Sequence, residues 1–323
     1  MYCRLKKIVL SAAGAALLAA SATAAAYPER PIRLVVPFPA GGLADTVARV
    51  VGERLGAVLG QPIVMDYKAG AATIIGADNA AKSTPDGYTL LLGSATTFAV
   101  NPIIYSKLPY APLTDFDPIG IVGSSALALV ANTALPVNDV KALIEAIKAE
   151  PAKYSYGSHG AGSTVHFAAE MLWRAAGVNV LHIPYKGSAP AMTDLMGGQI
   201  TMTFDSVPAA AAAAKGGRVK VLATTGSERA GLLPDVPTIS ESGYPVVLES
   251  WWAVVAPKGL PDDVRAKLTD ALAQTVADPS VHDKLAGLGF NTKYGSPGQF
   301  ATLIEQDTAK LAPIAKANDI RQD

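Results

Sequence analysis

Cysteine is almost absent from this sequence: Cys3 is the one cysteine among 323 residues. We expect Cys3 to be removed with the first 26 residues, which leaves a chain without a thiol. This excludes disulfide bonds and cysteine-based metal sites. The four histidines show neither H-x₃-H nor H-E-x-x-H spacing, so neither a metal site nor another cofactor is expected.

Charge is also scarce. Charged residues make up 17% of the chain, hydrophobic residues make up 50%, and the formal net charge is zero. This composition is typical of a folded globular protein and not of a disordered one. No basic excess points to nucleic acid or to an anionic membrane as a partner. After the first 26 residues, no apolar run reaches the length of a transmembrane helix.

The N-terminal stretch has the pattern of a cleavable export signal. Basic residues Arg4, Lys6 and Lys7 precede the apolar run Ile8–Ala20, and small-x-small cleavage sites lie within Ala22–Ala26. We therefore expect residues 1–26 to be a signal peptide and the mature protein to be periplasmic. Without its three basic residues, the mature chain carries three more acidic than basic residues.

The mature chain alternates short apolar strands with amphipathic helices, which predicts an α/β fold. Composition shifts near Gly123-Ser124-Ser125, where we expect the chain to enter a second lobe. The predicted organisation places residues 27–123 and 225–323 in lobe 1 and residues 124–224 in lobe 2. Strands are predicted at Ile119–Gly123 and Leu127–Ala131. Beyond the strand Glu249–Ala256 the chain is predicted to be all-helical and to pack on lobe 1, ending in the helix Pro297–Lys316 with Ser296 as its cap.

A junction rich in proline and glycine, Pro37–Gly42, joins the predicted strand Ile32–Val36 to the predicted helix Leu43–Leu59. Backbone N–H groups near Gly41, Gly42 and Leu43 would lie at a helix N-terminus, where partial positive charge accumulates. Such a terminus can hold an anion. The alternative is that the glycines only form a tight strand-to-helix turn.

A second junction, Gly157–Ser163, repeats this arrangement in the other lobe, between a predicted strand and the predicted helix Thr164–Ala176. It contains G-x-G but lacks the third glycine of a dinucleotide fingerprint, and it has no G-K-[ST] of a P-loop. Ser163, His166 and Asp205 are the residue types of a hydrolytic triad, but no G-x-S-x-G elbow surrounds the serine. An enzyme is therefore not the favoured interpretation.

Each lobe is thus predicted to have one loop that can hold an anion. Two such loops indicate a binding cleft between the lobes, because ligands of α/β sheets lie beyond the carboxyl ends of strands. The loops contain no arginine, which suits a small carboxylate held by amides, hydroxyls and water. Asp205 either accepts from a ligand amine or hydroxyl or caps the following helix. The candidate ligand-binding residues are Phe38, Ala40, Gly41, Gly42, Asp45, Ser94, Thr96, Thr97, Ser158, Gly160, Ala161, Gly162, Ser163, Thr164, His166, Tyr185, Gly187 and Asp205.

With these residues in place, the chain resembles the Bug receptors, the solute-binding receptors of tripartite tricarboxylate transporters. The resemblance is carried by YPERPIRLVVPFPAGGLADTVAR, TPDGYTLLLGS, YGSHGAGSTVH, HIPYKGSAPAMTDLMGGQI and LPDVPTISESGYP, in this order. It implies a two-lobed periplasmic binding protein of type II with a ligand cleft between the lobes. It also implies that carboxylates meet Ala40-Gly41-Gly42 and Ser158–Thr164, partly through water, and that the ligand passes to a two-component membrane permease.

The chain departs from the family pattern near the first loop. Leu43-Ala44 stands where small hydroxyl residues are usual, and Tyr67-Lys68-Ala69-Gly70 where an asparagine-arginine-proline-glycine run is usual. We therefore expect a ligand less polar than citrate, such as a mono- or aromatic carboxylate. Lys186 is expected to be solvated beside a ligand-facing turn backbone. Trp251 and Trp252 are expected to lie outside the site.

The resulting prediction is a monomeric periplasmic receptor that captures a small organic acid by lobe closure, without catalysis, and delivers it to the permease. Two alternatives stay open from the sequence. One is an exported hydrolase using Ser163 and His166. The other is a receptor that presents its ligand to a sensor kinase.

Overall fold

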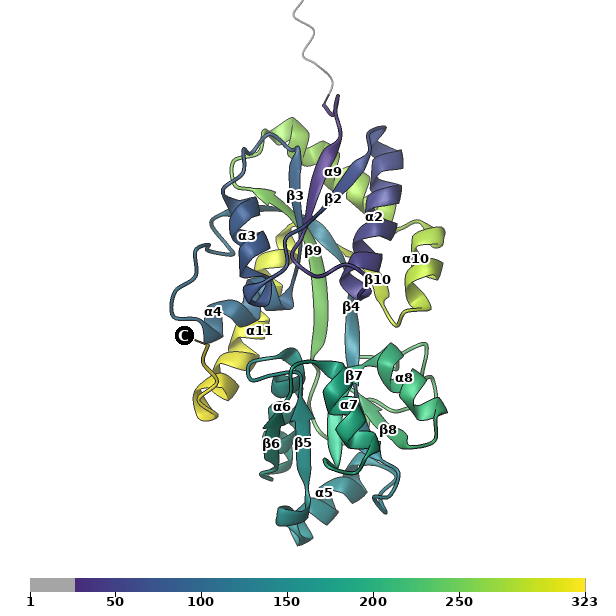
Figure 1. Cartoon of the computed structure of the whole chain (residues 1–323). Helices are drawn as coiled ribbons and strands as arrows, with labels where there is room; N and C mark the ends of the chain where they lie inside the picture. Colours follow the sequence, from purple (N-terminus) through teal and green to yellow (C-terminus); the bar gives the residue numbers. More distant parts are fainter. Residues whose placement is uncertain (1–26, 323) are drawn as a thin grey trace, which may run out of the picture.

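The computed structural model describes residues 27–322 as two lobes joined at a narrow waist (Figure 1). The expected signal peptide lies outside the described residues. The predicted two-lobed α/β fold is confirmed. Within residues 27–322, no helix is long and apolar enough to cross a membrane.

The upper lobe is built on parallel strands extended by antiparallel ones. Strand β1 pairs in parallel with β2 and β3, while β9 pairs antiparallel with β3. Helices α2, α9 and α10 cover one face, and α3 and α11 the other. The elements of this lobe are β1 (Ile32–Val36), α2 (Leu43–Leu59), β2 (Ile63–Tyr67), η1 (Ala71–Thr73), α3 (Ile74–Ala81), β3 (Thr89–Ser94), η2 (Thr96–Val100), α4 (Asn101–Ile104), α9 (Asp262–Val276), α10 (Pro279–Ala286), β10 (Asn291–Gly295) and α11 (Gly298–Ala317).

The lower lobe is built on a smaller sheet of parallel and antiparallel strands. Strand β5 pairs in parallel with β6 and β7, and β7 pairs antiparallel with β4. Its elements are α5 (Val140–Ala149), η3 (Pro151–Lys153), β5 (Ser155–Ser158), α6 (Thr164–Ala176), β6 (Leu181–Pro184), α7 (Ser188–Met196), β7 (Met202–Ser206), α8 (Val207–Lys215) and β8 (Val219–Thr224).

Two long strands cross the waist. Strand β4 (Phe116–Asn132) and strand β9 (Glu249–Pro257) pair antiparallel from Phe116 to Ala126 (Figure 1). The sequence predicted two separate strands in place of β4, because composition shifts at Gly123-Ser124-Ser125, between them. Pairing with β9 continues through these residues and keeps the strand continuous, with shifts of register between Pro118 and Gly120 and between Ile121 and Gly123.

Two predictions for the C-terminal part were wrong. The segment Asn291–Gly295 is strand β10, which pairs antiparallel with β4; its polar sequence carries no apolar alternation, so only this pairing makes it a strand. Helix α11 has Pro297 as its N-cap and no side-chain cap. In place of a bond accepted by the Ser296 side chain, the backbone N–H of Ser296 donates to Gln299 Oε1 at 2.8 Å.

The segment between β8 and β9 packs on the lower lobe. Ile239, Val246 and Leu248 are buried in the same cluster as Tyr156 and Phe204. The Ile239 N–H also donates to the carbonyl of Thr224 at 2.8 Å. We propose that the return to the upper lobe lies in β9, about 25 residues later than the sequence suggested.

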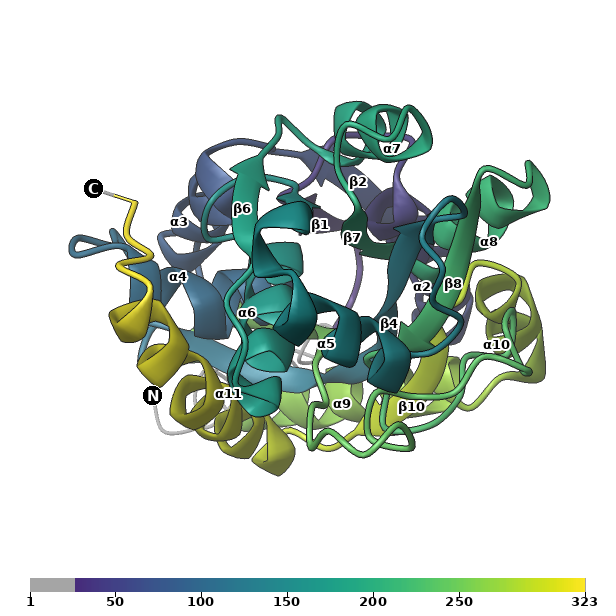
Figure 2. The same cartoon turned by 90° about the horizontal axis from the view of Figure 1, so that it is seen from below.

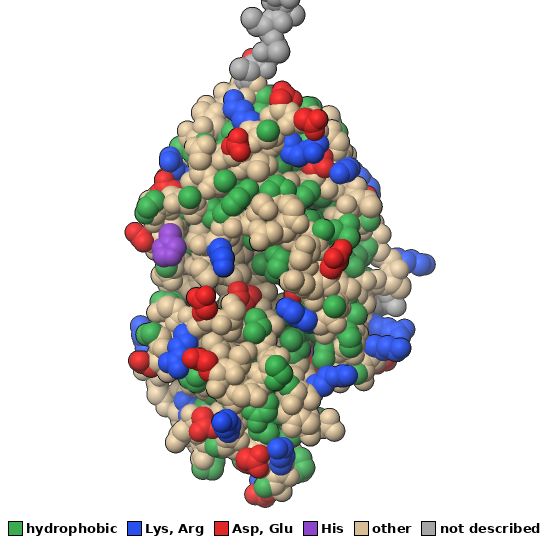
Figure 3. All heavy atoms as spheres, turned by 180° about the vertical axis from the view of Figure 1, so that it is seen from behind, with side chains coloured by type: hydrophobic (Ala, Val, Ile, Leu, Met, Phe, Trp, Pro, Cys, Tyr) green, Lys and Arg blue, Asp and Glu red, His purple; other side chains and the backbone are tan. Residues whose placement is uncertain are grey.

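Helix α11 packs on both lobes. Leu311, Ile314 and Ala315 share a buried cluster with Ile104 of the upper lobe and with lower-lobe side chains. Seen from below, α11 runs along the side of the molecule that carries α4 and α6 (Figure 2). Acidic and basic side chains are interspersed over the face opposite that of Figure 1 (Figure 3).

Candidate functional site

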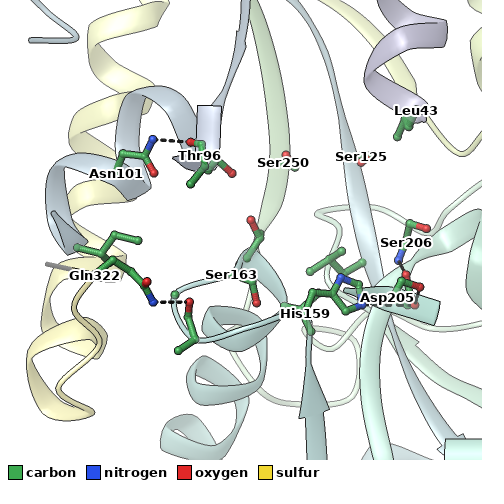
Figure 4. A pocket seen from close by; sticks show the side chains of 18 of the residues that line it. Leu43, Thr96, Asn101, Ser125, His159, Ser163, Asp205, Ser206, Ser250 and Gln322 are labelled. Carbon is green, nitrogen blue, oxygen red and sulfur yellow. Dashed lines mark hydrogen bonds and ion pairs between the residues drawn. The ribbon is translucent and has the colours of Figure 1, made fainter. Parts of the chain in front are cut away.

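A cleft of about 590 Å³ lies between the lobes. Side chains from both lobes and from the two crossing strands face it (Figure 4). Among the described residues that line it, Asp205 is the one carboxylate, and there is no lysine or arginine. The lining consists of Leu43, Ala72, Thr96, Asn101, Ile104, Tyr105, Ser125, Leu127, His159, Ala161, Gly162, Ser163, Thr164, Val165, Ser188, Asp205, Ser206, Ser250, Trp252 and Gln322.

The loop before α6 forms the lower wall of the cleft. Ser163 caps α6, because its Oγ accepts the N–H of His166 at 3.2 Å and donates to the carbonyl of Gly160 at 2.7 Å. Gly160 and Gly162 have φ of +119° and +75°, which glycine adopts without a Cβ penalty. The amides of Thr164 and Val165 have no intrahelical acceptor, because they lie in the first turn. Both residues line the cleft, at the positive end of the helix dipole.

Asp205 marks the other end of the lower wall, at the end of β7. The Ser188 hydroxyl donates to its Oδ2, the Ser206 N–H donates to its Oδ1 at 2.7 Å, and His159 Nε2 lies 3.5 Å from Oδ2. Burial opposes ionisation of Asp205, but the contacts with His159, Ser188 and Ser206 outweigh it and hold the pKa below the usual range. Asp205 is therefore a buried anion that accepts hydrogen bonds.

The upper wall is built around Asn101. Its side-chain nitrogen donates to the carbonyl of Ala72 at 2.7 Å and lies 3.2 Å from the Tyr110 hydroxyl. Ala71, Ala72 and Thr73 all have positive φ, between 45° and 79°. Three consecutive left-handed residues without glycine cost about 1–2 kcal/mol each. The bond from Asn101 stabilises this strained turn at the edge of the cleft.

The first glycine-rich loop is arranged differently from the prediction. The Gly41 N–H donates to Asp45 Oδ2 at 2.7 Å, and Asp45 Oδ1 accepts from Tyr67 and Arg49. The hydrogen bond from Tyr67, followed by that from Gly41, lowers the pKa of Asp45. The chain thus supplies its own anion to this helix N-terminus. None of the predicted carboxylate-binding residues Ala40, Gly41 and Gly42 lines the cleft, whereas Leu43 does.

The other predicted residues divide into three groups. Thr96, Ala161, Gly162, Ser163, Thr164 and Asp205 line the cleft together. Ser94, Thr97, Ser158 and His166 are buried in strands and helices and do not line the cleft. Outside the lining lie Phe38, which packs on the upper core, Gly160 and Gly187 with positive φ, and Tyr185, whose hydroxyl donates to Asp194 at 2.8 Å.

Ser163 and His166 do not form a nucleophile–base pair. The bond between them comes from the backbone N–H of His166, while His166 Nδ1 accepts from the N–H of Gly162 at 3.1 Å. Burial, and next the neighbouring His182, lower the pKa of His166 to about 4. His166 is 6% exposed, and its ring stacks on His182 with 4.0 Å between ring centroids. It therefore supports the loop from below as a neutral acceptor.

Several lining residues were missed from the sequence. Ser125 and Ser250 come from the crossing strands, and Gln322 from the segment after α11; no local motif marks them. Trp252 was expected outside the site but borders the cleft, whereas Trp251 faces away and donates to Asp307 at 2.7 Å. Within residues 27–322, no three histidine or acidic side chains gather as a metal site would require.

Comparison with known proteins identifies the family. The family model described as "Tripartite tricarboxylate transporter family receptor" matches residues 47–320. The chain is 36% identical over 301 residues to Protein BugT of Bordetella pertussis, covering 93% of this chain and 92% of that protein.

Solved structures agree in fold. The periplasmic binding protein BugD superposes with a TM-score of 0.75 at 37% identity, covering 92% of this chain and 100% of that one. Rpa4515 of R. palustris with adipate gives a TM-score of 0.79 at 34% identity, covering 91% and 99%. MatC from Rhodopseudomonas palustris with bound malate gives 0.74 at 29% identity, covering 89% and 99%. The chain therefore belongs to the receptor family of tripartite tricarboxylate transporters and has the two-lobed fold of its periplasmic binding proteins.

Proposed function

We propose that this protein is a periplasmic receptor that binds a small organic acid between its lobes and delivers it to a tripartite tricarboxylate-type permease. The observation that carries the proposal is the interlobe cleft of about 590 Å³, bordered by the N-terminus of α6. A cleft of this size holds a small ligand. Two relatives of the same fold hold dicarboxylic acids, adipate and malate.

The ligand carboxylate is assigned to the end of the loop and the first turn of α6, where the amides of Thr164 and Val165 and the Thr164 hydroxyl replace its hydration shell. The Gly162 N–H and the Ser163 hydroxyl shape this loop, because they already donate to His166 Nδ1 and to the Gly160 carbonyl. Asp205 then takes a hydroxyl or amine of the ligand, because an ionised carboxylate can only accept hydrogen bonds. Leu43, Ile104, Leu127 and Trp252 add apolar surface to the cleft. This composition favours an acid less polar than citrate.

We further propose that the protein acts by binding alone, as an exported monomer freed of residues 1–26. The Ser163–His166 arrangement supports this, because the imidazole is buried and already engaged by Gly162. Closure of the lobes about β4 and β9 then encloses the ligand.

A thermal-shift screen of the purified protein tests the proposal. The panel holds adipate, malate, citrate, benzoate and aspartate. An acid present at one hundred times its Kd adds about 2.7 kcal/mol to the free energy of unfolding, which raises the midpoint visibly. We expect adipate or benzoate to stabilise more than citrate. Stabilisation by citrate alone would overturn the proposed ligand class. No stabilisation by any acid, in protein that native mass spectrometry finds empty, would overturn carboxylate binding.

A further inference from the structure

The segment that follows α11 lies against the candidate ligand loop. A Cβ added at Gly162 would meet Ile104 Cδ1 at 3.0 Å, Ile320 Cγ2 at 3.5 Å and Gln322 Cγ at 3.6 Å. Ile320 is 3% exposed and belongs to the cluster that joins α11 to both lobes. The segment is therefore packed in place beside the cleft.

Gln322 bonds to both lobes at once. Its backbone N–H donates to the carbonyl of Ile104 in α4, and its side-chain Nε2 donates to the carbonyl of Ala161 in the lower loop, each at 2.9 Å. Its side chain borders the cleft on the side opposite Asp205 (Figure 4). One residue from the far end of the sequence thus connects the upper wall to the ligand loop.

The peptide unit between Ala161 and Gly162 is consequently held at both ends. Its carbonyl accepts from Gln322, and its N–H donates to His166 Nδ1 at 3.1 Å. Because a peptide unit is planar, two bonds on opposite edges fix its rotation. This rotation sets the direction of the loop that leads into the first turn of α6.

We propose that Gln322 is a positioning residue of the receptor: its side-chain amide holds the Ala161–Gly162 peptide in the orientation that binds ligand. This inference rests on the proposed function of the cleft. Without the amide, the loop samples other orientations, and the ligand must restore the productive one when it binds. Affinity falls while the fold persists, since the buried contacts of Ile320 and α11 remain.

Hydrogen–deuterium exchange of ligand-free protein tests the positioning directly. We compare wild type, Gln322→Ala and Gln322→Glu with Arg321→Ala. Arg321 is a matched control, because its side chain is 73% exposed and pairs with Asp319. We expect Gln322→Ala to speed exchange at the Gly162 amide about tenfold, and Gln322→Glu to do so at least as much, because a carboxylate oxygen repels the Ala161 carbonyl. Arg321→Ala should exchange as wild type does. Unchanged exchange in both Gln322 variants would overturn the inference.

Titration with adipate adds the functional readout. Gln322→Ala should raise the Kd about three- to tenfold, the range expected for one hydrogen bond, and the thermal midpoint without ligand should match that of Arg321→Ala. An unchanged Kd, or a midpoint that falls in step with the affinity, would overturn positioning in favour of a purely structural role. If wild type fails to bind adipate, that result counts against the proposed ligand, whereas the exchange experiment still decides the role of Gln322.

Discussion

Acidification should destabilise this protein through His166. The imidazole is buried beneath the ligand loop, stacks on His182, and accepts the Gly162 N–H at Nδ1. Protonation would turn this acceptor into a donor facing another donor. Burial, followed by the effect of His182, lowers the pKa of His166 to about 4, compared with 6.5 in the unfolded chain.

The sign and size of the effect follow from proton linkage. Between pH 6.5 and pH 4 the unfolded chain binds the proton more readily, so folding stability is lost as the pH falls through this window. The loss is about 2 kcal/mol at pH 5 and about 3 kcal/mol at pH 4, and it levels off at lower pH. The pKa of His182 is lowered by burial too, and it adds a loss in the same direction.

Urea unfolding at a series of pH values measures this loss. His166→Gln isolates the contribution of His166, because glutamine offers an acceptor but does not titrate; its stability should fall less than that of wild type between pH 7 and pH 5. The NMR titration of His166 should have its midpoint near pH 4. Equal pH dependence in both proteins, or a His166 midpoint near 6.5, would refute the reasoning.

Three substitutions test the cleft itself. Gly162→Ala places an alanine in the left-handed region against Ile104, so it should lower the free energy of unfolding in urea by about 1–2 kcal/mol. The control Gly231→Ala adds its Cβ in open space and should be nearly neutral; equal effects of the two variants would contradict the argument from backbone conformation. Asp205→Asn should weaken malate binding about tenfold but leave adipate binding equal or tighter, because adipate has no hydroxyl that could donate to the carboxylate. Calorimetric titrations measure both affinities, and equal losses would indicate that Asp205 shapes the wall of the cleft instead. Leu43→Ser should weaken adipate binding about three- to tenfold and improve binding of citrate relative to adipate. An unchanged ratio of the citrate and adipate affinities would mean that Leu43 does not contact the ligand.

The sequence alone determined the local elements and the class of fold. Helix α2 has its predicted bounds, Leu43–Leu59, because its apolar spacing is helical and Gly60 ends it with φ of 73°. Helix α6 likewise begins after its Ser163 cap and ends at Gly177. Asp139 caps α5, because its side chain accepts the Ala142 N–H at 2.8 Å. These features depend on residues within a few positions of one another, so sequence reasoning reaches them.

The tertiary structure decided which of these elements form the site. The loops around Gly41 and Gly162 look alike in sequence, and in each a side chain four residues later accepts the glycine N–H, yet only the loop around Gly162 lines the cleft. The walls of the cleft also depend on Asn101 and Gln322, whose partners lie 29 and 161 residues away. Strand β10 exists only through its pairing with β4. Such contacts are set by packing between distant segments, and no pattern of neighbouring residues encodes them.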